Sequence, residues 1–242
     1  MQVISSQIMN ILGTRLEVQT LQPEVPQSGP TLVFLHEGLG SVALWRDWPA
    51  RLCARLGCAG LVYSRQGYGQ SDITPDVRGP SRTENGQRHG RLLPDYMHRE
   101  ALDVLPALLH ALGIERPVLI GHSMGTQVVE RYLTSGGQAA GVVLMAPVPP
   151  SGTGGSASRL ALTRPDFFEE LPNAVSGRPT EATFQVMTDI YFSPEMPHQE
   201  LVEFLPMMEC ESDRAVAEMV ALPFLRTGRR PAIPALVMGG GV

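Results

Sequence analysis

Lysine is the residue that this chain lacks entirely: all 19 basic residues among its 242 are arginine. Without lysine the chain cannot form a Schiff base, bind phosphates through a Walker A lysine or use the strand lysine of a protein kinase. A GC-rich genome would produce the same composition, and the exclusions hold in that case too. The 24 acidic residues give a formal net charge of −5, so we expect no nucleic-acid partner.

Cysteine is also scarce, since only Cys53, Cys58 and Cys210 are present. They form no C-x-x-C pair and leave one over, which argues against a disulfide framework or a zinc site and is typical of a reducing cytoplasm. Residues 1–13 lack the basic and apolar regions of a secretory signal. The longest apolar run, at 139–148, is far shorter than the roughly 18 residues of a membrane helix. We therefore expect a soluble, cytoplasmic protein with no membrane partner.

Short apolar runs alternate with helical patterns over the first 150 residues. Continuous apolar runs of this length are typical of strands buried on both faces of a parallel sheet. Two alternating stretches at the N-terminus predict an antiparallel hairpin around Gly13. The fold class is therefore α/β, with a mostly parallel sheet and helices on both faces. The predicted strands are 1–11, 14–21, 31–35, 60–64, 117–121, 141–146 and 233–238. The predicted helices are 44–56, 95–112 (capped by Asp95 and kinked at Pro106) and 126–133, and residues 73–94 read as a loop.

The character of the chain changes after residue 150. Residues 151–231 hold several short helical patterns and no convincing strand, whereas 232–242 return to an apolar strand. We interpret residues 1–150 as the core, 151–231 as a helical cap inserted over the strand ends, and 232–242 as a return strand of the core.

The most specific motif is Gly-His-Ser-Met-Gly at 121–125, which follows an apolar strand and begins a helix. This strand–turn–helix context marks a nucleophile elbow, in which a strained turn lifts the Ser123 hydroxyl clear of the sheet. Glycines two residues before and after the serine are required because strand and helix approach too closely for a Cβ. The helix N-terminus places backbone N–H groups near developing negative charge. The alternative is an ordinary strand-to-helix junction that contains a serine.

A second motif, His-Glu-Gly-Leu-Gly at 36–40, directly follows another buried strand. A glycine-rich turn at this point can direct a backbone N–H at an oxyanion, with a second N–H from Met124. The alternative is a glycine turn with a structural histidine. For His36 itself we favour the structural role, a hydrogen-bonded brace of the loop.

With these two motifs in this order, the chain resembles the α/β-hydrolase superfamily over nearly its whole length. Residues 67–72 look like the family's Gly-x-Gly-x-Ser segment, which we interpret as structural. The resemblance implies that Ser123 is the nucleophile and that Met124 and Gly38, or Leu39 instead, supply the N–H groups of an oxyanion hole. Glu37 stands where the family usually has glycine, and its carboxylate would disfavour an oxyanion unless it points away.

The catalytic acid and histidine are not in the family's places. Family triads run in the order nucleophile, acid, histidine, and the acid is due after the strand at 233–238, where the chain stops at Val242. Pro147–Pro150 offer no earlier acid. His198, in the predicted cap, is the one histidine that could reach the site. The others are His36, His89, His98, His110 and His122. We expect a truncated chain, lacking the last strand and helices, with negligible turnover on its own.

The leading hypothesis is a serine hydrolase that cleaves a carboxylic ester or similar acyl bond through an acyl-enzyme. A non-catalytic binding module of the same fold is the rival, and a carbon–carbon bond hydrolase or cofactor-free haloperoxidase would use the same scaffold. The sequence argues against a dehalogenase, because such an enzyme would have Asp at the position of Ser123. We expect no cofactor and no metal. His98 and Glu100 match the first half of a zinc deaminase motif, but the chain lacks the cysteine pair that would complete the zinc site.

Apolar side chains in the predicted cap favour a small-molecule substrate with an apolar acyl group. Packing of the cap is the alternative role for most of them, and the oligomeric state is open. These side chains are Phe167, Phe168, Phe184, Met187, Tyr191, Phe192, Phe204, Met207, Met208 and Met219.

Overall fold

The computed structural model describes residues 2–24, 29–72, 97–149, 152–175, 179–209, 211, 213–221 and 232–239. The chain divides into two compact units. The first contains the described residues up to 72, those from 97 to 148, and 232–239. The second contains the described residues from 149 to 221. The loop expected at 73–94 and the helix cap expected at Asp95 lie outside the described residues.

An antiparallel hairpin begins the first unit, as the alternating pattern predicted. Strands β1 (Gln2–Ile11) and β2 (Thr14–Pro23) pair with Ile11 opposite Thr14. The two residues between them have positive φ, 51° at Leu12 and 79° at Gly13. Such a turn matches the right-handed twist of the strands, so it sets the register of the hairpin.

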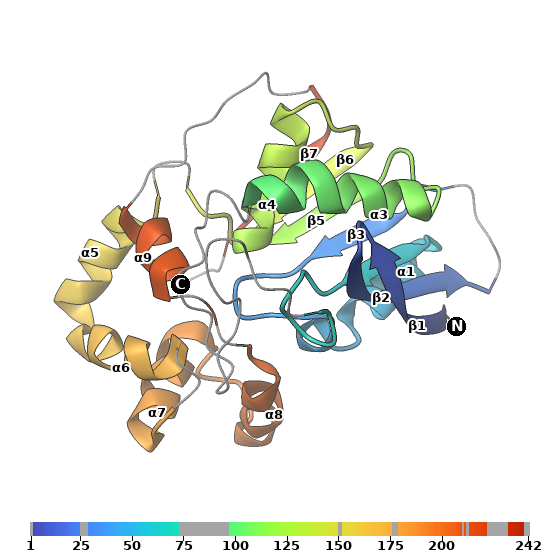
Figure 1. The fold of residues 1–242 in the computed structure, drawn as a ribbon. Helices are drawn as coiled ribbons and strands as arrows, with labels where there is room; N and C mark the ends of the chain where they lie inside the picture. The colour runs from blue at the N-terminus through green and yellow to red at the C-terminus, as the bar shows by residue number, and fades with distance from the viewer. Residues whose placement is uncertain are drawn as a thin grey trace. The chain divides into compact units, whose positions relative to one another are not determined.

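A seven-stranded sheet forms the centre of this unit, in the order β1-β2-β4-β3-β5-β6-β7 (Figure 1). Strand β2 pairs antiparallel with β4, whereas β4, β3, β5, β6 and β7 run parallel to one another. The prediction of a mostly parallel α/β sheet is therefore confirmed. The parallel strands are β3 (Leu32–Leu35), β4 (Gly60–Tyr63), β5 (Val118–His122), β6 (Gly141–Met145) and β7 (Ala235–Met238).

Both faces of the central strands are buried, which explains their unbroken apolar runs. Figure 1 shows α3 (Leu105–Ala111) and α4 (Met124–Thr134) on one side of the sheet and α1 (Trp48–Leu56) on the other. Successive side chains of a strand point to opposite faces of the sheet. Val33 and Leu35 of β3 point to one face and are fully buried, and Leu32 and Phe34 on the other face are buried too. The core cluster on the α1 side comprises Leu21, Leu32, Phe34, Cys53, Val62 and Ile120. Each such side chain contributes about 1.5–3 kcal/mol by leaving water.

The helix expected at 44–56 is interrupted. A 3-10 turn, η1 (Ala43–Trp45), comes first, Arg46 then adopts a φ of 50°, and α1 begins afterwards at Trp48. Pro49 lies in the first turn of α1 and explains the break, because its ring clashes with a preceding turn and it has no N–H to donate. The helix ends as predicted at Gly57, whose φ of 65° is the left-handed conformation of a glycine cap.

The helical stretch from Met97 also departs from a regular helix. Its middle is a π-helical segment, η2 (Glu100–Val104), followed by α3 with Pro106 in its first turn. We expected a kink at Pro106. The structure instead has the wider π-helical turns directly before this proline. Glu100 is buried and accepts a hydrogen bond from the Tyr63 hydroxyl at 2.5 Å.

Every regular element described in the second unit is a helix, where the sequence showed several short helical patterns and no convincing strand. None of the helices in the described part of the chain has the length and hydropathy needed to cross a membrane. The elements are α5 (Gly154–Thr163), α6 (Pro165–Val175), α7 (Glu181–Tyr191), α8 (His198–Phe204), η3 (Leu205–Met207) and α9 (Asp213–Ala221).

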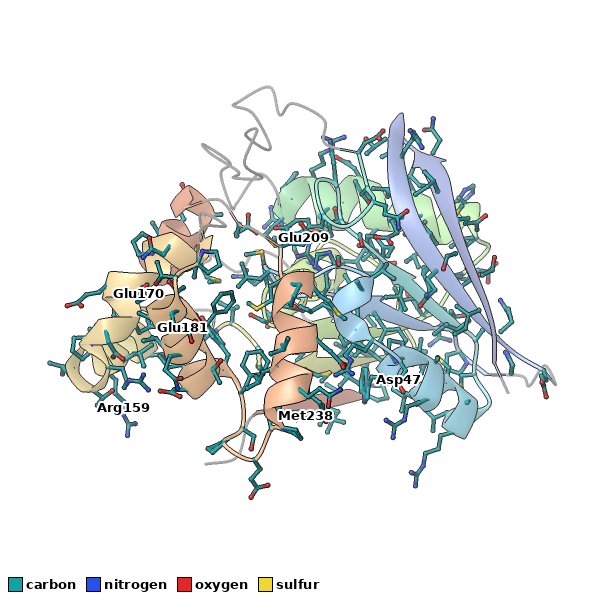
Figure 2. All side chains as sticks on the ribbon, turned by 90° about the horizontal axis from the view of Figure 1, so that it is seen from below. Asp47, Arg159, Glu170, Glu181, Glu209 and Met238 are labelled. Atoms are coloured by element: carbon teal, nitrogen blue, oxygen red, sulfur yellow. The ribbon has the colours of Figure 1, made fainter. Side chains whose placement is uncertain are left out.

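A small apolar cluster and one polar cap hold α6 and α7 together. Phe167, Val186 and Met187 form the buried centre of the cluster, against which Phe168 packs. At the start of α7, Thr183 donates to the Glu170 carboxylate, labelled in Figure 2. Hydrogen bonds from Thr183 and Asn173 lower the pKa of Glu170. Phe167, Phe168 and Met187 thus pack the helices of this unit, which is the alternative role that the sequence left open for them.

The two described cysteines should differ in reactivity. Burial, with a further contribution from Cys58, raises the pKa of the Cys53 thiol to about 12, so Cys53 has almost no thiolate at pH 8. Cys58 is half-buried. We expect iodoacetamide at pH 8 to alkylate Cys58 well before Cys53 in the folded protein, as measured by peptide mass spectrometry. Both should react alike in urea. Equal rates in the folded protein would contradict the burial of Cys53.

Candidate functional site

The two sequence motifs meet at the carboxyl edge of the parallel sheet. Strands β3 and β5 are direct neighbours, with Leu35 opposite Gly121. The segments that follow them, 36–40 and 123–125, therefore leave the sheet side by side. Carboxyl ends of parallel strands are where α/β proteins place their ligand sites.

Ser123 occupies a strained turn between β5 and α4. Its φ of 47° and ψ of −115° lie outside the regions that L-residues favour, which costs about 1–3 kcal/mol. The Ser123 N–H donates to the Met145 carbonyl of β6 at 2.9 Å. The Ser123 carbonyl accepts from the Thr126 hydroxyl at 2.6 Å. These bonds on both sides of the residue maintain the strained conformation, and the strained strand–turn–helix junction expected at Ser123 is present.

The flanking glycines are required by close backbone contacts, as predicted. A Cβ on Gly121 would lie 2.8 Å from the Gly125 carbonyl oxygen. A Cβ on Gly125 would lie 2.8 Å from the Leu35 carbonyl carbon and 2.9 Å from the His36 carbonyl oxygen. The first turn of α4 thus rests directly on the end of β3, and no side chain fits between them.

Both motifs contain backbone N–H groups that form no hydrogen bond with the described residues. Met124 is the first residue of α4, so its N–H has no helical carbonyl one turn earlier to bond. In the other motif Gly40 N–H donates to the Glu37 carbonyl at 3.4 Å, which closes a turn with Gly38 and Leu39 at its centre. No hydrogen bond within the described part of the chain uses the N–H of either central residue.

A buried polar network orients that turn. The Glu37 carbonyl accepts from His36 Nδ1 at 2.7 Å and from the Arg65 guanidinium at 2.6 Å, and Arg65 also donates to the His36 carbonyl. Because C=O and N–H of a trans peptide point in opposite directions, the Gly38 N–H is directed away from Arg65. His36 Nε2 accepts from the Arg65 N–H at 3.1 Å, so both ring nitrogens are occupied. His36 is thus the structural brace that we expected.

Arg65 was missed by sequence reasoning. It is fully buried, and its guanidinium lies 5.1 Å from the centre of the Tyr68 ring. The only sequence signal was its position just before the glycine-rich segment 67–72. That segment is structural, as predicted: Ser71 donates to the Ser64 carbonyl at 2.6 Å, and Asp72 accepts from the Arg15 N–H at 3.0 Å.

The side chain of Glu37 points at His122, the residue before Ser123. Its carboxylate lies 3.2 Å from Nδ1 of His122. The His122 ring also contacts Trp45, with ring centres 6.2 Å apart. The sequence left open where this carboxylate points, and the structure shows that it pairs with an imidazole.

The Ser123 hydroxyl forms no hydrogen bond with any side chain that the structure describes. His98 lies beside the last turn of α4, where its Nδ1 bonds Arg131 at 3.0 Å. His198 belongs to the second unit, and His89 lies outside the described residues. No group of three metal-ligating side chains occurs among the residues that are described.

Comparison with known families identifies one match over most of the chain. The model described as "Alpha/beta hydrolase family" matches residues 32–240. A search of curated proteins found no significant match.

Solved structures with the same fold include hydrolases of different chemistry. An esterase (EaEST) from Exiguobacterium antarcticum superposes with a TM-score of 0.63 at 15% identity, covering 96% of this chain and 80% of the esterase. The epoxide hydrolase CorEH gives 0.60 at 17% identity, with 99% and 83% covered. Proline iminopeptidase from Mycobacterium smegmatis gives 0.62 at 19% identity, with 96% and 80% covered. At these identities the likeness extends to the fold alone.

Replacing Gly125 by alanine should destabilise the first unit by about 3 kcal/mol, because the new Cβ meets backbone that cannot move aside. Urea unfolding measures the change. Gly155→Ala in α5 is the matched control, since nothing lies within 4 Å of its Cβ position and alanine favours a helix. A Gly125→Ala protein as stable as the wild type would show that α4 does not rest on β3.

Proposed function

The chain belongs to the alpha/beta hydrolase family, and we propose that it is a serine hydrolase that cleaves carboxylic esters or similar acyl bonds. The observation that carries this proposal is the strained backbone of Ser123 at the junction of β5 and α4. A binding protein gains nothing from such a conformation, whereas a nucleophile needs its hydroxyl raised from the sheet.

In the proposed reaction the Ser123 hydroxyl oxygen attacks the substrate carbonyl carbon. The negative charge that develops on the carbonyl oxygen is stabilised by the N–H groups of Met124 and Gly38. Gly38 is favoured over Leu39 because the Arg65 and His36 bonds to the Glu37 carbonyl direct the Gly38 N–H away from them. The leaving alcohol departs, an acyl-serine forms, and water releases the acid.

A general base must take the Ser123 proton and later return one to the leaving group. Since no described side chain bonds that hydroxyl, we propose that residues 1–242 alone turn over slowly. A small molecule with an apolar acyl group remains our proposed substrate, with no cofactor and no metal.

A non-catalytic binding module is the second candidate, and the same unbonded Ser123 hydroxyl favours it. The two differ in one property: only a hydrolase needs a serine that reacts with an acyl or phosphonyl group.

A fluorophosphonate reagent tests the nucleophile directly. We expect it to add one phosphonyl group at Ser123, detected by intact-mass and peptide mass spectrometry, because the elbow exposes the hydroxyl beside free N–H groups. Ser123→Ala should remain unlabelled, and Ser135→Ala, which removes an exposed serine at the end of α4, should label as the wild type does. Absence of label on the wild type would favour the binding module.

Hydrolysis of a nitrophenyl ester by residues 1–242 tests the base. We expect a slow release of nitrophenolate, measured by absorbance. The release should be slower still in Ser123→Ala. Turnover of about 10 s⁻¹, usual for enzymes, would show that a base within these residues reaches Ser123.

A further inference from the structure

Two residues directly precede the groups that the proposed reaction uses. Glu37 precedes Gly38 in the turn after β3, and His122, the last residue of β5, precedes Ser123 and Met124. Their side chains meet at 3.2 Å between Glu37 Oε2 and His122 Nδ1. The pair therefore links the two segments that supply the N–H groups.

The pair is partly shielded from water, with 18% of the Glu37 side chain and 38% of the His122 side chain exposed. Trp45 packs against the His122 ring. Hydrogen bonds also hold the Glu37 backbone on its other side, through His36 and Arg65. The position of Glu37 is thus determined by contacts with both the side chain and the main chain.

Gly40 provides the space that the carboxylate occupies. The three atoms nearest to a Cβ built on Gly40 all belong to the Glu37 carboxyl group, including Cδ at 2.6 Å and Oε2 at 2.8 Å. Gly40 has no positive φ, so alanine would be tolerated by the backbone at this position. The methyl group of an alanine there would meet the Glu37 carboxylate first and push it from His122.

We propose that Glu37 and His122 are positioning residues that hold the Gly38 and Met124 N–H groups at the spacing an oxyanion requires. This inference rests on the proposed function. The hydrogen bond to His122 also directs the carboxylate away from the Gly38 N–H, where an unpaired negative charge would oppose the oxyanion. Small displacements of such donors slow a reaction strongly while leaving substrate binding almost unchanged.

The experiment compares Glu37→Ala, Glu37→Gln, Gly40→Ala and the double variant Glu37→Ala/Gly40→Ala. Ser123 is phosphorylated with a nitrophenyl dialkyl phosphate, and the reaction is monitored through the nitrophenolate that it releases. The dependence of the rate on reagent concentration gives a limiting rate and a half-saturating concentration. Asp47→Asn is the control for loss of a carboxylate, because Asp47 is exposed at the start of α1 (Figure 2). Tryptophan fluorescence reports the His122 ring independently, since Trp45 contacts it.

We expect Glu37→Ala and Gly40→Ala each to lower the limiting rate by about tenfold or more with an unchanged half-saturating concentration. Glu37→Gln, which keeps an acceptor for His122, should retain more of the rate. The double variant should match Glu37→Ala, because the added methyl group then meets no carboxylate. Fluorescence should change in the same variants.

Three results would overturn the proposal. Wild-type rates in Glu37→Ala and Gly40→Ala would refute the positioning role and leave the proposed function intact. Additive effects in the double variant would show that Gly40 does not act through Glu37. An unreactive Ser123 in the wild type would refute the proposed function and the positioning role together, even with the fluorescence changes present.

Discussion

The close approach of α4 to β3 is the constraint on which the rest of the site depends. The backbone at Gly125 lies against the carbonyls of Leu35 and His36, with no room for a side chain. This contact brings the N-terminus of α4 beside the turn that follows β3. It also forces Ser123, at the end of β5, into a turn that an L-residue avoids. The strain is maintained because Met145 and Thr126 bond the backbone on each side of it.

A second polar layer determines the direction of the peptide groups at this edge. Arg65 is fully buried, where a charged side chain is costly unless it is hydrogen-bonded. Its hydrogen bonds to the carbonyls of His36 and Glu37 offset part of that cost. The bond to the Glu37 carbonyl also directs the Gly38 N–H away from Arg65. Nearer the surface, Glu37 reaches His122 across the same junction. The site is thus shaped by backbone contact, by a buried cation and by a half-buried pair.

Local patterns predicted most of the elements, because strand burial and turn chemistry leave signals within a few residues. Gly57 ended its helix as expected, whereas the helix expected at 44–56 was interrupted, since the effect of Pro49 on the preceding turn outweighed the apolar spacing. The contacts that sequence reasoning missed join residues far apart in the chain. Arg65 binds carbonyls 28 and 29 residues away, and Glu37 meets His122 across 85 residues. No spacing rule connects positions so far apart.

The sequence by itself determined the α/β class, the hairpin at the N-terminus and the elbow at Ser123, because each depends on neighbouring residues whose preferences the chain displays directly. It also showed that Glu37 departs from the family pattern. Only the tertiary structure decided what that departure does, since the answer depends on which side chains the parallel pairing of β3 and β5 brings together. Strand pairing sets two distant turns side by side, and the contacts between them are a property of the fold.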